Sequence, residues 1–130
     1  MSLTPEYDIG PLSWVKDEID RALRQVNDVL AHYNLTEDDP AKLRLARTHL
    51  HQVTGAIEMV GLQGVTLVCQ EIEKLAESLE LGRLPISQTE LDIISNASNE
   101  LEHYLDELLN GKPNLELQLF PIYQHLRQLI

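Results

Sequence analysis

Apolar residues recur every three or four positions in several long segments of this chain, and that spacing limits the fold more than any other feature. It places apolar side chains on one face of an α-helix. The spacing predicts four long helices, over about residues 11–33, 40–60, 65–82 and 87–111. No segment shows the alternating β-branched residues that are typical of strands. We therefore expect an all-α fold.

Residues that start or stop helices separate these segments. Asp39 before Pro40 is typical of a helix start, with the aspartate as a side-chain cap. Ser87 and Glu90 have the spacing of a capping box. The glycines that are typical of breaks and helix ends are Gly61, Gly64, Gly82 and Gly111. Because the breaks are short, neighbouring helices are expected to pack antiparallel.

The two ends of the chain complete the predicted fold. Residues 1–10 are expected to be an irregular lead-in, and residues 11–130 a single helical domain that is a fragment of a larger multidomain protein. Pro121 predicts an extended segment over 114–119 and a short closing helix over 121–129. The expected architecture is an antiparallel up-and-down four-helix bundle with an additional short C-terminal helix.

The composition limits the partners of this domain. The 130 residues suffice for one ordinary domain, and 10 Lys and Arg against 21 Asp and Glu give a formal net charge of −11. Such a charge repels phosphate backbones and anionic lipids, so we expect no nucleic acid partner and no binding to a membrane surface. Cys69 is the only cysteine, and no apolar run reaches about 18 residues, so no membrane insertion is expected. A cytoplasmic location is expected.

The second predicted helix carries the most specific group of polar residues. A helical wheel gathers, opposite the apolar side, Arg47, Thr48, His51, Thr54, Gly55 and Glu58. His51 is therefore predicted to face solvent, where a neutral imidazole nitrogen can act as a nucleophile towards phosphorus. His49 lies about 200° around the helix from His51, so the two histidines cannot share a metal ion.

Gly55 lies inside this helix, one turn after His51. A glycine in a helix interior costs about 1 kcal/mol relative to alanine. Two interpretations of the bare backbone remain open. It leaves room for a protein that docks beside His51, or it relieves crowding against a neighbouring helix.

The residues around His51 resemble a known signature. The segment HQVTGAIEMVG, residues 51–61, resembles the H-x-[LI]-K-G-x(5)-G pattern of histidine-containing phosphotransfer (HPt) domains, in the spacing of its histidine and two glycines. The phrases LSWVKDEID, QEIEKL and LFPIYQHLRQL are further similar to the N-terminal HPt-like region of CheA-like hybrid histidine kinases that govern type IV pili and twitching motility. This resemblance covers residues 12–129.

The resemblance implies a function for His51. The histidine would accept a phosphoryl group at Nε2 from a histidine kinase catalytic domain, and pass it to an aspartate in the receiver domain of a response regulator. Glu73 matches the glutamate that orients the imidazole in such domains, and Gly55 would provide clearance for docking. Thr54 stands where the family usually has a lysine. Arg47 lies one turn before His51 on the same face of the helix, and it is either a further contact to the phosphoryl group or an ordinary surface charge.

The resemblance also implies what the domain lacks. ATP and magnesium belong to the partner domains, so no cofactor and no metal are expected in this one. The domain would be a carrier within a histidine kinase rather than an independent catalyst.

Two other functions remain open. The first is a docking or scaffold module of the same ancestry that no longer accepts phosphate, which the missing lysine at Thr54 favours. The second is a metal-dependent enzyme, since Glu100 and His103 form an E-x-x-H motif, although ferritin-like sites need a second copy and two more glutamates.

The remaining notable residues are interpreted as structural. Cys69, Trp14 and Tyr33 are predicted to pack in the interior. Other histidines expected to be partly exposed and without a function are His32, His103 and His125.

Overall fold

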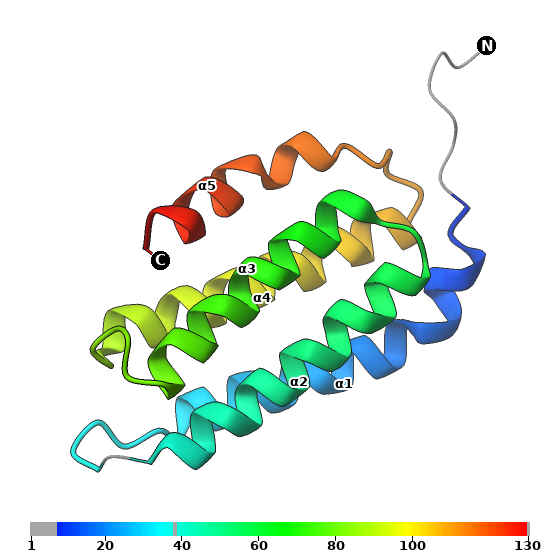
Figure 1. Cartoon of the computed structure of the whole chain (residues 1–130). Helices are drawn as coiled ribbons and strands as arrows, with labels where there is room; N and C mark the ends of the chain where they lie inside the picture. Colours follow the sequence, from blue (N-terminus) through cyan, green and yellow to red (C-terminus); the bar gives the residue numbers. More distant parts are fainter. Residues whose placement is uncertain (1–7, 38, 130) are drawn as a thin grey trace.

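The computed structural model describes residues 8–37 and 39–129, and within these ranges it shows helices joined by turns and loops (Figure 1). The four long helices are α1 (Gly10–Ala31), α2 (Pro40–Met59), α3 (Gln63–Glu80) and α4 (Gln88–Leu109). A 3₁₀ turn, η1 (Glu116–Leu119), leads into the short helix α5 (Phe120–Leu129). The predicted all-α fold, with four long helices and a short C-terminal one, is confirmed.

The four long helices run side by side in alternating directions, so the bundle is of the up-and-down type (Figure 1). Helix α2 packs against α1 on one side and α3 on the other, and α4 packs against α1 and α3. Helix α5 lies along the outside of α3, with η1 over the start of that helix. This arrangement leaves one side of α2 uncovered.

The core lies between the long helices. Each of them contributes a row of buried aliphatic side chains, which includes Leu23, Leu50, Ile72 and Leu101. Burying one such side chain stabilises the fold by about 1.5–3 kcal/mol. Cys69 and Tyr33 are also buried, as predicted.

The prediction that Trp14 packs in the interior is wrong, because its side chain is 87% exposed. The buried face of α1 passes through Leu12, Lys16 and Ile19, and Trp14 lies on the opposite side of the helix. Lys16 is buried because its ammonium group binds Asp20 Oδ1 at 2.6 Å and Asp106 Oδ1 at 2.5 Å. On this part of α1 the charged Lys16, and not the apolar Trp14, therefore faces the core.

The helix starts are placed as the sequence predicts, but neither Asp39 nor Ser87 makes a cap hydrogen bond with its own side chain. Helix α2 begins at Pro40 after Asp39, whose carboxylate makes no cap hydrogen bond and lies 4.0 Å from Lys42 Nζ. Ser87 precedes α4, and its hydroxyl group donates to the Glu90 carboxylate but accepts no cap hydrogen bond from a backbone N–H. This hydrogen bond lowers the pKa of Glu90.

Glycines end three of the helices in the predicted places. Gly61 follows α2 with φ +81°, Gly82 follows α3 with φ +74°, and Gly111 follows α4 with φ +91°. Left-handed backbone of this kind favours glycine, because a Cβ atom would clash there. Gly64 differs from the prediction, since it lies in the first turn of α3 instead of in a break. A Cβ atom on Gly64 would lie 2.5 Å from Glu116 Oε2, so the glycine permits close packing of η1 on α3.

The predicted extended segment over 114–119 is wrong in part, because residues Glu116–Leu119 form η1. Helix α5 then begins one residue before Pro121. A proline is tolerated there because the first turn of a helix needs no backbone donor. At the other end of the chain, α1 begins at Gly10, and most of the predicted lead-in over 1–10 lies outside the described residues.

Within residues 8–37 and 39–129, none of the helices combines the length and the apolar character that a membrane crossing requires.

Candidate functional site

His51 lies in the middle of α2 on the uncovered side of the helix, and its side chain is 79% exposed. Its Nδ1 atom lies 2.6 Å from Oε1 of Glu73, which comes from the neighbouring helix α3. Glu73 is 22 residues away in the sequence, so the α2–α3 hairpin brings the two side chains together. Only 17% of the Glu73 side chain is exposed.

The hydrogen bond to Glu73 assigns the tautomer of His51. An ionised carboxylate can only accept, so Nδ1 must carry the proton and donate it. The lone pair of a neutral ring then belongs to Nε2. Among the described residues, Nε2 has no hydrogen-bond partner. The imidazole thus presents a nucleophilic nitrogen to solvent.

The wheel placed Thr54 on the solvent side with His51, and this placement is wrong. Thr54 is only 5% exposed, because it lies about 60° around α2 from His51, on the side that α3 covers. Its Oγ1 atom lies 3.0 Å from Glu73 Oε2 and 3.0 Å from the backbone oxygen of Leu50. Thr54 and His51 therefore bind the two oxygens of one carboxylate.

Gly55 does not relieve crowding against a neighbouring helix. A Cβ atom built on it would meet no atom within 4 Å among the described residues. Gly55 instead lines a groove between α1 and α2, about 530 Å³ in volume, which also contains His51. The groove walls include Glu18, Arg21 and Gln25 from α1, and Met59 from α2. The Met59 side chain is 85% exposed. We call this hollow the His51 groove.

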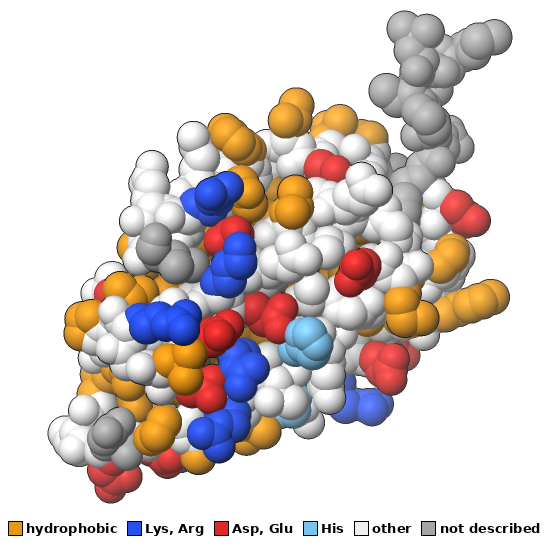
Figure 2. Space-filling view, viewed as in Figure 1, with side chains coloured by type: hydrophobic (Ala, Val, Ile, Leu, Met, Phe, Trp, Pro, Cys, Tyr) orange, Lys and Arg blue, Asp and Glu red, His pale blue; other side chains and the backbone are white. Residues whose placement is uncertain are grey.

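Arg47 lies one turn before His51, but another side chain holds its guanidinium group. Its Nε atom lies 2.5 Å from Oε2 of Glu80 on α3, and Arg44 Nε lies 3.0 Å from Oε1 of the same carboxylate. The bond from Arg47 lowers the pKa of Glu80, with a smaller contribution from Arg44. Interleaved basic and acidic side chains of this kind are visible over the face that α2 and α3 form (Figure 2).

Arg21 is a candidate that the sequence did not identify. It is exposed on α1 and lines the His51 groove, on the opposite wall from α2. No ion pair to Arg21 occurs within the described part of the chain. Its position beside His51 depends on how α1 and α2 align, and no local pattern in the sequence specifies that alignment.

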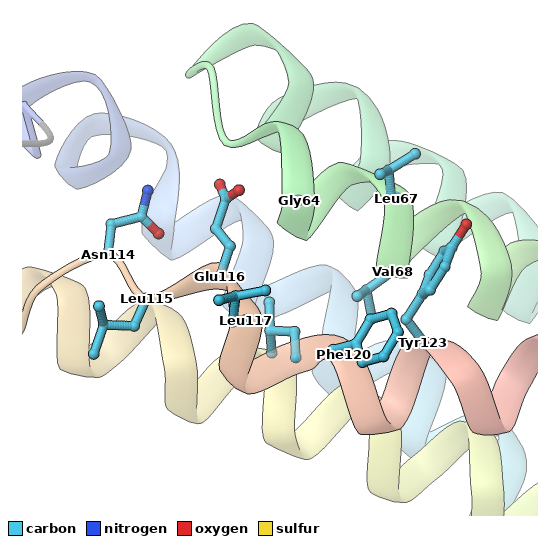
Figure 3. Close-up of a pocket in the computed structure, with 10 residues that line it drawn as sticks. Gly64, Leu67, Val68, Asn114, Leu115, Glu116, Leu117, Phe120 and Tyr123 are labelled. Carbon is cyan, nitrogen blue, oxygen red and sulfur yellow. The ribbon is translucent and has the colours of Figure 1, made fainter. Parts of the chain in front are cut away.

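A second hollow lies elsewhere, between the start of α3 and the η1–α5 segment (Figure 3). Its volume is about 590 Å³, and its walls are mainly apolar, with Leu67, Leu117, Phe120 and Tyr123 prominent among them. Glu116 is its one ionisable carboxylate, and this side chain rests against Gly64. The second hollow contains no histidine, cysteine or lysine.

The E-x-x-H motif is not assembled into a larger cluster. His103 Nε2 lies 2.9 Å from Oε1 of Glu107, one turn along α4. Among the residues described, no three His, Cys, Asp or Glu side chains are grouped as metal ligands. His32, His103 and His125 are exposed, and burial raises the pKa of the Cys69 thiol.

Comparison with known proteins agrees with this geometry. Residues 12–111 match the Hpt domain family. The chain is also similar to a Pseudomonas aeruginosa protein named "Scaffold protein FimL", at 25% identity over 116 residues, which is 89% of this chain. The chain spans about a fifth of the length of that relative, 21%. With an exposed histidine on a four-helix bundle and a family match over most of its length, this chain belongs to the Hpt domain family.

Proposed function

We propose that this domain carries a phosphoryl group on His51 in a two-component phosphorelay. The observation that supports this most directly is the state of one side chain. His51 is exposed, its Nδ1 atom is bound to Glu73, and its Nε2 atom faces open space beside the His51 groove. An imidazole held in this way is prepared for nucleophilic attack.

The phosphoryl transfer requires no proton to leave the domain. The Nε2 lone pair attacks the γ-phosphorus of ATP bound to a kinase domain, an N–P bond forms, and the P–O bond to ADP breaks. The ring then carries a positive charge, which the Glu73 carboxylate stabilises through the proton on Nδ1. In the second step an aspartate oxygen of a receiver domain attacks the phosphorus, and the N–P bond breaks.

The His51 groove is where the partner domains would dock. Gly55 leaves the groove floor open one turn after His51, and the Met59 side chain provides an exposed apolar contact beyond it. Arg21, on the other wall, provides a positive charge for the phosphoryl group. Arg47 is a second source of charge, although Glu80 already binds it. The similarity of LFPIYQHLRQL and the other segments to the kinases that govern type IV pili supports a role in a signalling system of that class.

A docking or scaffold module is the second candidate. The family usually has a lysine three residues after the phosphoacceptor, and this chain has Thr54 at that position. Thr54 is buried, so its side chain cannot contact a phosphoryl group on Nε2. The relative from Pseudomonas aeruginosa is named as a scaffold protein. In this alternative the His51 groove binds the same partners, but His51 remains unmodified.

A transfer assay separates the two candidates. The domain is incubated with radiolabelled ATP and a panel of CheA-like kinase catalytic domains, and then with receiver domains. We expect label on the wild type and on His103→Gln, and none on His51→Gln. His103 is a matched control, since its side chain is 75% exposed and also lies beside a glutamate.

Two results would count against phosphotransfer. Label that survives in His51→Gln would mean that another residue is the acceptor. Binding of a kinase or receiver domain without any label would support the docking module. The small donor phosphoramidate provides a further check, because it can phosphorylate an accessible imidazole, with release of ammonia, without any protein partner.

A further inference from the structure

A chain of hydrogen bonds links a buried side chain to the exposed imidazole. Thr54 Oγ1 lies 3.0 Å from Glu73 Oε2, and Glu73 Oε1 lies 2.6 Å from His51 Nδ1. Exposure rises along this chain, from 5% for Thr54, through 17% for the Glu73 side chain, to 79% for the His51 side chain. This series of hydrogen bonds therefore begins in the interior at Thr54 and ends at the surface at His51.

We propose that Thr54 is a positioning residue for His51. Its hydroxyl group holds the Glu73 carboxylate so that the other oxygen of that carboxylate fixes the imidazole in the Nδ1–H tautomer. The effect on transfer rate rests on the proposed function, whereas the effect on the tautomer does not. Thr54 thus replaces the family's lysine with a neutral internal donor.

The hydroxyl group of Thr54 has one hydrogen and two acceptors within reach. A threonine inside a helix usually donates to the carbonyl four residues earlier, here Leu50. The Glu73 carboxylate is ionised and is the stronger acceptor of the two. Thr54 is buried and only 17% of the Glu73 side chain is exposed, so water has little access to replace the threonine as the donor to Oε2.

Without this hold, Glu73 has another partner nearby. The pKa of Arg47 is raised mainly by its hydrogen bond to Glu80, with a smaller contribution from the charge of Glu73. A carboxylate side chain that turned towards Arg47 would leave Nδ1 without its acceptor. A threonine holds the carboxylate but does not compete with His51 by charge.

Nitrogen NMR of the histidine ring tests this proposal without any partner protein. The ¹⁵N shifts report which ring nitrogen carries the proton when the imidazole is neutral, at alkaline pH. We expect a single Nδ1–H tautomer for His51 in the wild type, and a mixture of tautomers in Thr54→Val and Thr54→Ala. Thr54→Ser, which keeps the hydroxyl group, should restore the single tautomer.

Thr66→Val is the matched control. Thr66 is also a buried threonine, 8% exposed, and its Oγ1 atom donates to the backbone oxygen of Leu62 at 2.8 Å, but it contacts no carboxylate. Its substitution should remove a comparable buried hydroxyl group and leave the His51 tautomer unchanged. A general loss of packing would affect Thr66→Val as well, so the comparison isolates the hold on Glu73.

The rate of phosphorylation by phosphoramidate gives a second measurement. Thr54→Val removes one hydrogen bond of ordinary strength, so the phosphorylation rate should decrease by about three- to tenfold. The proposal is overturned if Thr54→Val and Thr54→Ala keep the wild-type tautomer, or if the wild type itself shows a mixture. A changed tautomer in a domain that never accepts phosphate would support the positioning role and refute the proposed function, so the two failures are distinguishable.

Discussion

Gly55→Ala is expected to strengthen the fold and weaken docking at the same time. Alanine is favoured over glycine by about 1 kcal/mol in a helix interior. The new Cβ atom meets no described atom within 4 Å, so none of this gain should be lost to a clash. For a domain of this size, the melting temperature should rise by about 3–5 °C.

The same methyl group enters the His51 groove, where a partner domain would have to pack against it. Overpacking at a fitted contact typically costs about 1–3 kcal/mol, which corresponds to a decrease of about 5- to 150-fold in kcat/KM for transfer from a kinase domain. Phosphoramidate is small enough to avoid the methyl group. Its reaction with His51 should therefore proceed at the wild-type rate.

Thermal unfolding and the two phosphorylation assays measure these effects. Asn96→Ala is the control, because Asn96 is an exposed residue inside α4, which packs against α1 and α3. It should add about 0.5 kcal/mol through the same helix preference and leave transfer unchanged. Transfer from a kinase domain to Gly55→Ala at the wild-type rate would refute the docking role of this glycine. A lower melting temperature would show that the space around it is not open.

Three further predictions concern charges and burial. Arg21→Ala should slow transfer by up to about fivefold, and Arg47→Ala by less because Glu80 already binds Arg47. Single-turnover transfer rates of the two variants measure this. Equal rates for Arg21→Ala and the wild type would contradict it. Cys69 should react with a thiol reagent only on unfolding, because burial raises its pKa; fast labelling of the folded domain would contradict its burial. The bond from Arg47 lowers the pKa of Glu80 in the folded state, so its stabilising effect is present above the ordinary glutamate value of 4.5 and is lost as the pH falls through the lower folded value. Glu80→Gln should therefore be less stable than the wild type at pH 7 and lose less stability on acidification, as urea unfolding at several pH values would show.

The helices were predictable because their signals are local. The apolar rows of the long helices and the residues at their ends, such as Pro40 and Gly82, lie within a few turns of the structure that they specify. The exceptions are also local in origin. The sequence around Pro121 reads as extended when the proline is taken as a helix breaker, but a first turn accepts it, and η1 leads into α5.

The site was predictable only where a helical wheel is sufficient. The exposure of His51 follows from its own helix, and its pairing with Glu73 was implied by the family resemblance. The burial of Thr54 was not predicted, because a wheel does not show which side of α2 a neighbouring helix covers. Arg21 was missed for the same reason, since it joins the His51 groove from α1. Contacts between helices depend on their alignment, which the apolar pattern leaves undetermined.

The exposed position of Trp14 has a practical consequence. It is the only tryptophan, and it lies on α1 one turn before Glu18, which lines the His51 groove. Since its indole is already in water, its fluorescence should change little when the bundle unfolds. The same indole would lose solvent when a bound protein extends one turn beyond the groove, so the native chain carries its own optical reporter of complex formation.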